Sequence, residues 1–151
     1  MTKKPKILAI IPARGGSKSV TRKNIKELGG KPLLAYTTES ATQSKLIDRL
    51  ILSSEDEKII ETAKSLDFEV PFVRPQELAK DQSGSLEVVQ HDVEFLEQQG
   101  DFYNAVLLLQ PTYPFREKGF INQAIITFIN SNADALLSVY SYQISYNFNC
   151  Y

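Results

Sequence analysis

Basic and glycine residues are concentrated in one short stretch near the start of the chain. Residues 14–26 hold five of the 17 lysines and arginines and no acidic residue. Gly15 and Gly16 carry no Cβ, so the backbone can approach a ligand closely, and consecutive amide N–H groups in such a turn form a concavity that binds anions. Three side chains of this stretch would add charge-assisted hydrogen bonds to a triphosphate, namely Arg14, Lys18 and Lys23. The stretch therefore predicts a phosphate-binding loop.

The alternative for any basic run is a solvated turn. Neither the dinucleotide motif GxGxxG nor the P-loop motif GxxxxGK[ST] is present in this loop. Its position favours the binding interpretation, because it directly follows the apolar run of residues 7–11, which is typical of a strand buried on both faces of a parallel sheet. We therefore expect another kind of nucleotide site.

Further apolar runs predict the other strands that position this loop. Residues 50–52, 105–109 and 135–139 each predict a central strand, and residues 68–72 predict a shorter one. Such strands bury their side chains on both sides, so helices must cover the two faces of the sheet.

Helical periodicities separate these strands. They predict helices over residues 32–43, 54–66, 86–100 and 120–129, the second opening with a capping box formed by Ser54 and Glu57. The alternation predicts an α/β fold with a Rossmann-like, doubly wound, mostly parallel sheet and helices on both faces. Ligands of such folds bind at the carboxyl ends of the strands.

Composition limits the partners and the location. The chain of 151 residues predicts one domain over residues 1–151, and its formal net charge of −1 predicts no nucleic-acid partner. No stretch reaches the roughly 20 apolar residues of a membrane span. The single cysteine, Cys150, cannot form an internal disulfide, so we expect a cytoplasmic protein. The single histidine, His91, lies within a predicted helix and away from the strand ends, which argues against a catalytic role.

Four stretches, in order, resemble signatures of the cytidylyltransferases that activate nine-carbon sugar acids. This is the acylneuraminate cytidylyltransferase (CMP-sialic acid synthetase) family, with its legionaminate and pseudaminate relatives. The stretches are IIPARGGSK at residues 10–18 with RKN at 22–24, GKPL at 30–33, RPQELAKD at 74–81 and LQPTYPFR at 109–116. The resemblance covers nearly the whole chain and implies the nucleotide-diphospho-sugar transferase type of fold.

The resemblance implies a reaction and its partners. A hydroxyl at the anomeric carbon of a sialic-acid-like sugar acid attacks the α-phosphate of CTP, and pyrophosphate leaves. Mg²⁺ is the implied cofactor, and the full-length form is implied to be a homodimer. The family pattern places Arg14, Ser17 and Lys18 on the phosphates, and Lys23 joins Arg14 in a catalytic role as charge develops on the leaving group.

The resemblance also assigns the rest of the site. It places Asn24, Arg74 and Ser85 around the cytosine and ribose, and Gln110 toward the sugar acid. Each has a simpler alternative that the sequence leaves open. Asn24 could cap a turn, Arg74 before Pro75 could be exposed and extended, and Ser85 could be a helix N-cap.

The chain departs from the family pattern at several positions. Ser19 and Thr21 stand where the family usually has Gly and Pro, and Tyr113 stands where it has Ser or Thr. Residues 53–56 read SSED, where the family commonly has Ser-Thr-Asp. Loss of a Gly and a Pro predicts a looser phosphate loop.

The family pattern continues past the strand expected at residues 135–139, with an arm exchanged between subunits and acidic ligands for Mg²⁺. We recognise neither here and expect an N-terminal portion of the fold, with its metal ligands unknown. One alternative is a catalytically incomplete nucleotide-binding module. Another is a cytidylyltransferase for the eight-carbon acid Kdo, which ranks lower because residues 110–114 read QPTYP in place of QGDEP.

Overall fold

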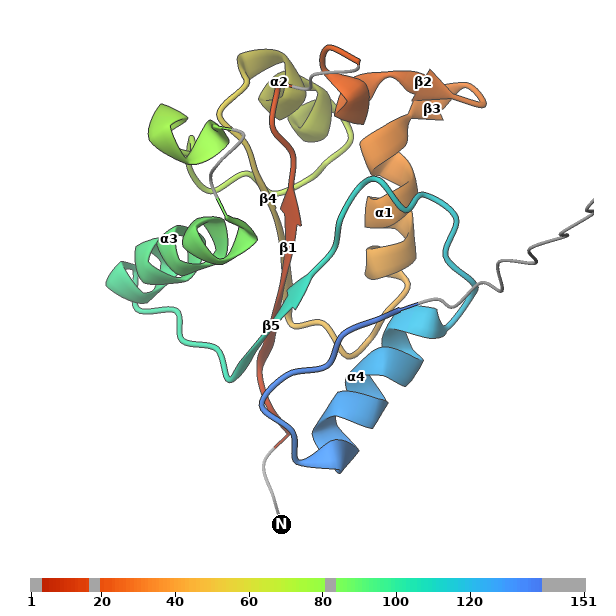
Figure 1. Cartoon of the computed structure of the whole chain (residues 1–151), viewed down its shortest axis with the longest axis vertical. Coiled ribbons are helices and arrows are strands. Elements are labelled where there is room, and N and C mark those ends of the chain that lie inside the picture. Colours follow the sequence, from red (N-terminus) through yellow and green to blue (C-terminus); the bar gives the residue numbers. More distant parts are fainter. Residues whose placement is uncertain (1–3, 17–19, 81–83, 140–151) are drawn as a thin grey trace, which may run out of the picture.

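Three parallel strands form the central sheet of the computed structural model, which describes residues 4–16, 20–80 and 84–139. The strands are β1 (Ile7–Pro12), β4 (Arg49–Ser53) and β5 (Ala105–Leu108), in the order β4-β1-β5 (Figure 1). In the register of the sheet, Ile10 of β1 lies between Ile51 and Leu108. The carboxyl ends of all three strands therefore meet at one edge.

In the described ranges four α-helices accompany the sheet, namely α1 (Leu33–Thr42), α2 (Glu57–Ser65), α3 (Ser85–Gln98) and α4 (Phe120–Ser131). Two 3₁₀ turns, η1 (Lys23–Ile25) and η2 (Gln76–Ala79), lie near the strand ends, together with a hairpin of β2 (Glu27–Leu28) and β3 (Lys31–Pro32). The hairpin turns at Gly29 and Gly30, whose φ angles of 59° and 87° favour glycine.

The side chains of β1 alternate between two apolar clusters. Ile7, Ala9 and Ile11 join a cluster with residues of α1, α2 and α4. Leu8 and Ile10 point to the other face and pack against Leu96 of α3. Figure 1 shows α3 on one side of the sheet and α1 and α4 on the other. The predicted α/β fold with helices on both faces is confirmed, and the double burial explains why β1 is continuously apolar.

Two predicted strands are not strands. Residues 135–139 are exposed, with Leu137 82% exposed, and they pair with no strand in the described part of the chain. Residues 68–72 approach β4 through one backbone hydrogen bond, from Leu52 N to Glu69 O at 2.9 Å, without forming a ladder. An apolar run becomes a strand only where a neighbouring backbone offers successive partners.

Two predicted helix details are also wrong. The capping box of Ser54 and Glu57 is absent, because α2 begins at Glu57 and its N-cap is Asp56, whose carboxylate accepts from Ile59 N at 3.1 Å. The buried Ser54 Oγ accepts from Asp56 N at 3.2 Å. Ser85 is the first residue of α3, and Gly84 is the N-cap, so the N-cap alternative for Ser85 is wrong too.

The buried face of α3 includes a charged residue. Leu86 is 69% exposed, whereas Val88, Asp92 and Leu96 are buried at intervals of four residues. A buried aspartate within this stripe could not be recognised from the apolar pattern alone. None of the helices in the described ranges has the length and hydropathy that crossing a bilayer requires.

Candidate functional site

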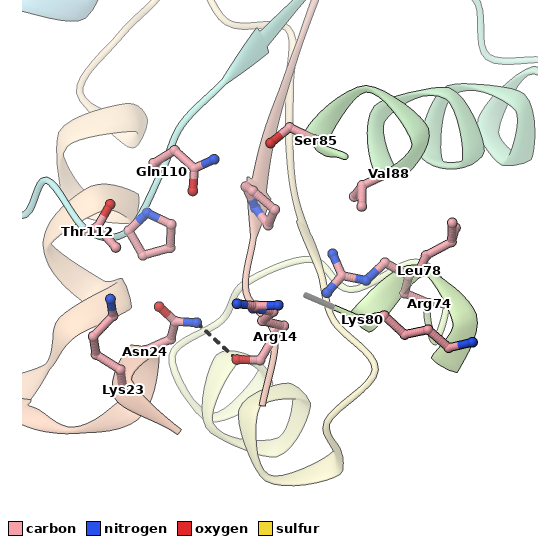
Figure 2. A pocket seen from close by; sticks show the side chains of 12 residues that line it. Arg14, Lys23, Asn24, Arg74, Leu78, Lys80, Ser85, Val88, Gln110 and Thr112 are labelled. Carbon is pink, nitrogen blue, oxygen red and sulfur yellow. Dashed lines mark hydrogen bonds between the residues drawn. The ribbon is translucent and has the colours of Figure 1, made fainter. Parts of the chain in front are cut away.

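A cavity of about 310 Å³ lies at the carboxyl ends of β1 and β5. Its lining comes from the residues after β1, from η1, from the segment around η2, from the start of α3 and from the residues after β5 (Figure 2). The structure brings together six residues predicted for the site: Arg14, Lys23, Asn24, Arg74, Ser85 and Gln110.

The lining of this cavity is cationic. Arg14, Lys23, Arg74 and Lys80 contribute to it, and none of the described lining residues is acidic. Figure 2 shows Lys23 and Asn24 on one side, and Arg74 and Lys80 on the other. A concave site lined by one sign of charge focuses its field and attracts the opposite sign. The geometry therefore suits an anionic ligand about as large as a nucleotide.

Asn24 ties η1 to the end of β1. Its side-chain Nδ2 donates to the carbonyl oxygen of Arg14 at 3.2 Å, and the residue is 8% exposed (Figure 2). This bond holds the start of the loop, as the turn-capping alternative predicts. Asn24 also lines the cavity, so its position suits both interpretations.

Arg74 is buried in the cavity wall. The residue is 3% exposed, so the alternative of an exposed, extended arginine is wrong. Its backbone N–H donates to Ser54 O at 2.9 Å, and its Nη2 donates to Glu55 Oε2 at 2.8 Å. Among the described atoms its buried Nε has no hydrogen-bond partner. Because burying a cation is costly, the carboxylate beside it is essential to this position.

Glu55 also contacts the predicted phosphate loop. Its Oε1 accepts from the backbone N–H of Gly15 at 2.8 Å. The Gly15 amide, which we expected to face an anionic ligand, donates to a carboxylate instead. Gly16 is exposed and borders a neighbouring cavity that Glu55 also lines. The predictions for Ser17 and Lys18 fall outside the described residues.

A second carboxylate, that of Asp56, binds the other end of the loop at Arg22. Asp56 accepts from Arg22 Nε at 3.0 Å, and Arg22 N donates back to Gly15 O at 3.2 Å. Arg22 adopts a left-handed backbone with a φ of 51°. A Cβ added to Gly15 would lie 2.2 Å from Asp56 Oδ2, so only glycine fits against this carboxylate.

Arg116 shapes the segment that carries Gln110. Its Nη2 donates to Gln110 O at 2.9 Å, and its Nη1 donates to Tyr113 O at 2.6 Å and to Thr37 Oγ1 of α1 at 2.9 Å. Burial lowers the pKa of this guanidinium from its usual value. The planar fork therefore joins the loop after β5 to α1, and it sets the position of Gln110.

A family model of cytidylyltransferases matches residues 8–147, which is most of the chain. The chain belongs to the cytidylyltransferase family. It is 41% identical over 138 residues to the pseudaminic acid cytidylyltransferase of Campylobacter jejuni (strain 81-176), covering 91% of this chain and 60% of that protein. To the CMP-N,N'-diacetyllegionaminic acid synthase of Legionella pneumophila it is 42% identical over 121 residues, covering 80% and 52%.

Another relative is the N-acylneuraminate cytidylyltransferase of Escherichia coli O18:K1:H7, 41% identical over 120 residues, covering 80% of this chain and 27% of that protein. This cytidylyltransferase chain thus spans 60% or less of the length of these three relatives. The recognised resemblance to the acylneuraminate group is confirmed.

Solved structures agree on the fold. A CMP:2-keto-3-deoxy-manno-octonic acid synthetase complexed with CTP superposes with a TM-score of 0.70 at 18% identity, covering 85% of this chain and 49% of that one. A 4-diphosphocytidyl-2C-methyl-D-erythritol synthase gives 0.65 at 19% identity, covering 95% and 68%. Both likenesses support the Rossmann-like nucleotidyltransferase fold.

Sequence reasoning missed three residues that shape this candidate site. Glu55, Asp56 and Arg116 hold the loops but were not assigned to the site. The available signals were the departure from the family pattern at residues 53–56 and the position of Arg116 inside the fourth signature. Neither signal says which backbone group the side chain contacts.

Asp92 is a further buried charge near the site. It is fully buried, accepts from Ser53 Oγ at 3.1 Å and lies 3.0 Å from His91 Nδ1. Burial raises the pKa of its carboxyl, and the bonds from His91 and Ser53 offset part of that rise. His91 packs edge-on against Phe72 and does not belong to the cavity lining.

The described residues do not form a metal site. No three His, Cys, Asp or Glu side chains come together in the described ranges as they would around an ion. Glu55 and Asp56 both contact the loop, and Glu55 already accepts from Gly15 and Arg74 while Asp56 accepts from Arg22. We therefore derive no chemical step through the expected Mg²⁺.

Proposed function

We propose that this chain binds CTP and takes part in transferring its cytidylyl group to a sialic-acid-like, nine-carbon sugar acid, with release of pyrophosphate. The supporting observation is the cationic cavity at the strand ends of a cytidylyltransferase fold, in which six residues assigned from the sequence converge. Its basic side chains Arg14 and Lys23 suit a triphosphate, and its volume is in the range of small-molecule sites.

The proposed roles follow the positions of the side chains. Arg14 and Lys23 would contact the phosphates, with Ser17, Lys18 and the loop at Gly15 and Gly16 completing that part. Asn24, Arg74 and Ser85 would surround the cytosine and ribose, and Gln110 would face the sugar acid. All six described side chains of this set line one cavity, so a single bound nucleotide could reach them together.

In the proposed reaction, the anomeric hydroxyl oxygen forms a bond to the α-phosphorus of CTP. The bond from that phosphorus to the bridging oxygen breaks, its electron pair stays on pyrophosphate, and the hydroxyl proton passes to solvent. Such a transfer needs positioning and charge stabilisation without a covalent enzyme intermediate. Lys23 and Arg14 would stabilise charge on the leaving group, and a contact of this kind contributes about 3–4 kcal/mol.

The names of the sequence relatives support the sugar class. Pseudaminic, diacetyllegionaminic and neuraminic acids appear in the names of proteins that are 41–42% identical to this chain. The Kdo-type synthetase shares only the fold, at 18% identity. The nine-carbon acids therefore come first and Kdo second. Mg²⁺ dependence, a homodimer and a cytoplasmic location belong to the same proposal.

Calorimetric titration of the chain with CTP, ATP and GTP tests the nucleotide. We expect CTP to bind most tightly, and Lys23→Ala to weaken that binding while Lys58→Ala, a change at an exposed position on α2, does not. Equal affinity for the three nucleotides would contradict the base-specific part and leave a general phosphate site.

Pyrophosphate release in the presence of CTP and Mg²⁺ tests the transfer. The acceptors are pseudaminic acid, diacetyllegionaminic acid, N-acetylneuraminic acid and Kdo, each offered separately. Release with a nine-carbon acid supports the proposal, and release with Kdo alone would favour the second candidate. CTP binding without release from any acceptor would favour the nucleotide-binding module.

A further inference from the structure

The Glu55 carboxylate joins two parts of the cavity wall that are far apart in the sequence. Oε1 accepts from Gly15 N and Oε2 accepts from Arg74 Nη2, each at 2.8 Å. The Glu55 side chain is 6% exposed and the Arg74 side chain 3%. Both oxygens therefore have definite partners, and little water reaches the pair.

This arrangement constrains both partners. A buried ion pair is tolerated when its geometry is good and its remaining hydrogen-bonding groups are satisfied, and losing one partner leaves a buried charge uncompensated. The Nε of Arg74 has no partner among the described atoms, so the guanidinium depends on Glu55 for compensation. Asp56 lies against Gly15 and leaves no room for a Cβ there.

The two partners belong to different parts of the site. Gly15 is the first glycine of the loop that follows Arg14, and its amide is fixed by the bond to Glu55. Arg74 lines the wall on the side of η2. One carboxylate thus sets the distance between the loop and this wall.

We propose that Glu55 is a positioning residue, which holds the loop at Gly15 and the Arg74 guanidinium in the relative placement that a nucleoside triphosphate requires. The inference rests on the proposed function. Glu55 would act through Gly15 and Arg74, since its oxygens are already engaged and it is not part of the lining of the cationic cavity.

Simple electrostatics and positioning predict opposite results for one substitution. Glu55→Gln removes a negative charge next to a polyanion site, so electrostatics alone predicts tighter CTP binding. Glutamine has one acceptor oxygen in place of two, so it can accept from Gly15 or from Arg74 but not from both, and positioning therefore predicts weaker binding. A matched control is Glu57→Gln, which removes the same charge from an exposed position two residues away.

Calorimetric titration with CTP compares these variants with the wild type. We expect Glu55→Gln to weaken CTP binding about tenfold or more, as for a broken buried pair, and Glu57→Gln to leave it within about twofold. In an Arg74→Gln background the Glu55→Gln change should have less than about a threefold effect, since the shared partner is already lost. Circular dichroism of each variant serves as the control for folding.

Amide exchange measured by NMR reports the Gly15 contact in the wild type without any variant. We expect the Gly15 N–H to be protected and the Gly16 N–H, at an exposed residue, to exchange quickly. A Gly15 amide as fast as that of Gly16 would overturn the inference, even if Glu55→Gln failed to fold.

The two proposals fail in different ways. A wild-type chain with no affinity for CTP would refute the proposed function. A wild type that binds CTP, with a folded Glu55→Gln variant that binds it equally well or better, would overturn the positioning role alone.

Discussion

Replacing Gly15 by alanine should destabilise the chain far more than the same change at the neighbouring Gly16. At Gly15 the new Cβ would lie 2.2 Å from Asp56 Oδ2 and 2.8 Å from Asp56 Cβ and Cγ. Contacts this short do not occur between unbonded atoms, so Asp56 or the loop must move. At Gly16 the added Cβ meets no described atom within 4 Å.

The magnitude follows from what Asp56 does. It caps α2 through Ile59 N, and losing such a cap costs about 1 kcal/mol. It also accepts from Arg22, whose side chain is 39% exposed, so this pair adds less than about 1 kcal/mol. Relaxing the overlap itself costs about 1–3 kcal/mol. We expect Gly15→Ala to lower the free energy of unfolding by about 2–5 kcal/mol, and Gly16→Ala to change it by at most about 0.5 kcal/mol.

Urea unfolding followed by circular dichroism measures both variants. A second background tests the cause, because Asp56→Gly removes the overlapping atoms while glycine remains an acceptable N-cap. In that background, Gly15→Ala should cost less than about 1 kcal/mol. If Gly15→Ala were as stable as Gly16→Ala, or cost the same with and without the Asp56 side chain, the close contact would not explain the glycine.

Three further predictions concern residues around the site. Arg116→Lys should lower the free energy of unfolding by about 1–3 kcal/mol in urea, because a lysine cannot reproduce the fork that bonds three acceptors, and wild-type stability would contradict this role. Burial raises the pKa of the Asp92 carboxyl above its ordinary value of 3.8, so the folded state holds this proton more tightly than the unfolded state does. The wild type should therefore lose stability relative to Asp92→Asn as the pH rises from 3.8 through the folded-state pKa. A stability difference that does not change with pH in urea titrations would refute this prediction. Lys23→Ala should lower kcat more than it raises the KM for CTP in pyrophosphate-release assays, since charge builds up on the leaving group, and a change in KM alone would make Lys23 an ordinary binding residue.

The sequence was sufficient to predict that the candidate residues converge at the carboxyl ends of the strands. Residues 7–11 are continuously apolar because both faces of β1 are covered, and this pattern is visible without a structure. The carboxyl ends of parallel strands meet at one edge, so the loops after β1 and β5 had to converge there. The convergence of six predicted residues on one cavity follows from this topology, while their individual roles stay predictions.

Local patterns were less reliable where the decisive partner was distant. Ser54 and Glu57 have the spacing of a capping box, but Asp56 is the N-cap of α2. Residues 135–139 have the composition of a strand, but no strand lies beside them in the described chain. The composition of a segment indicates which secondary structure it favours. Pairing depends on whether another backbone lies beside it.

Only the tertiary structure decided how the site is held together. The bond from Gly15 to Glu55 joins residues 40 positions apart, and the bond from Arg116 to Thr37 joins residues 79 positions apart. Contacts of this kind leave no periodic signature, because a single polar side chain at a strand or loop end looks the same in the sequence whether it faces solvent or a buried partner. The fold brings these residues together, and burial then makes each hydrogen bond necessary, because an unpaired charge or amide inside the protein is costly.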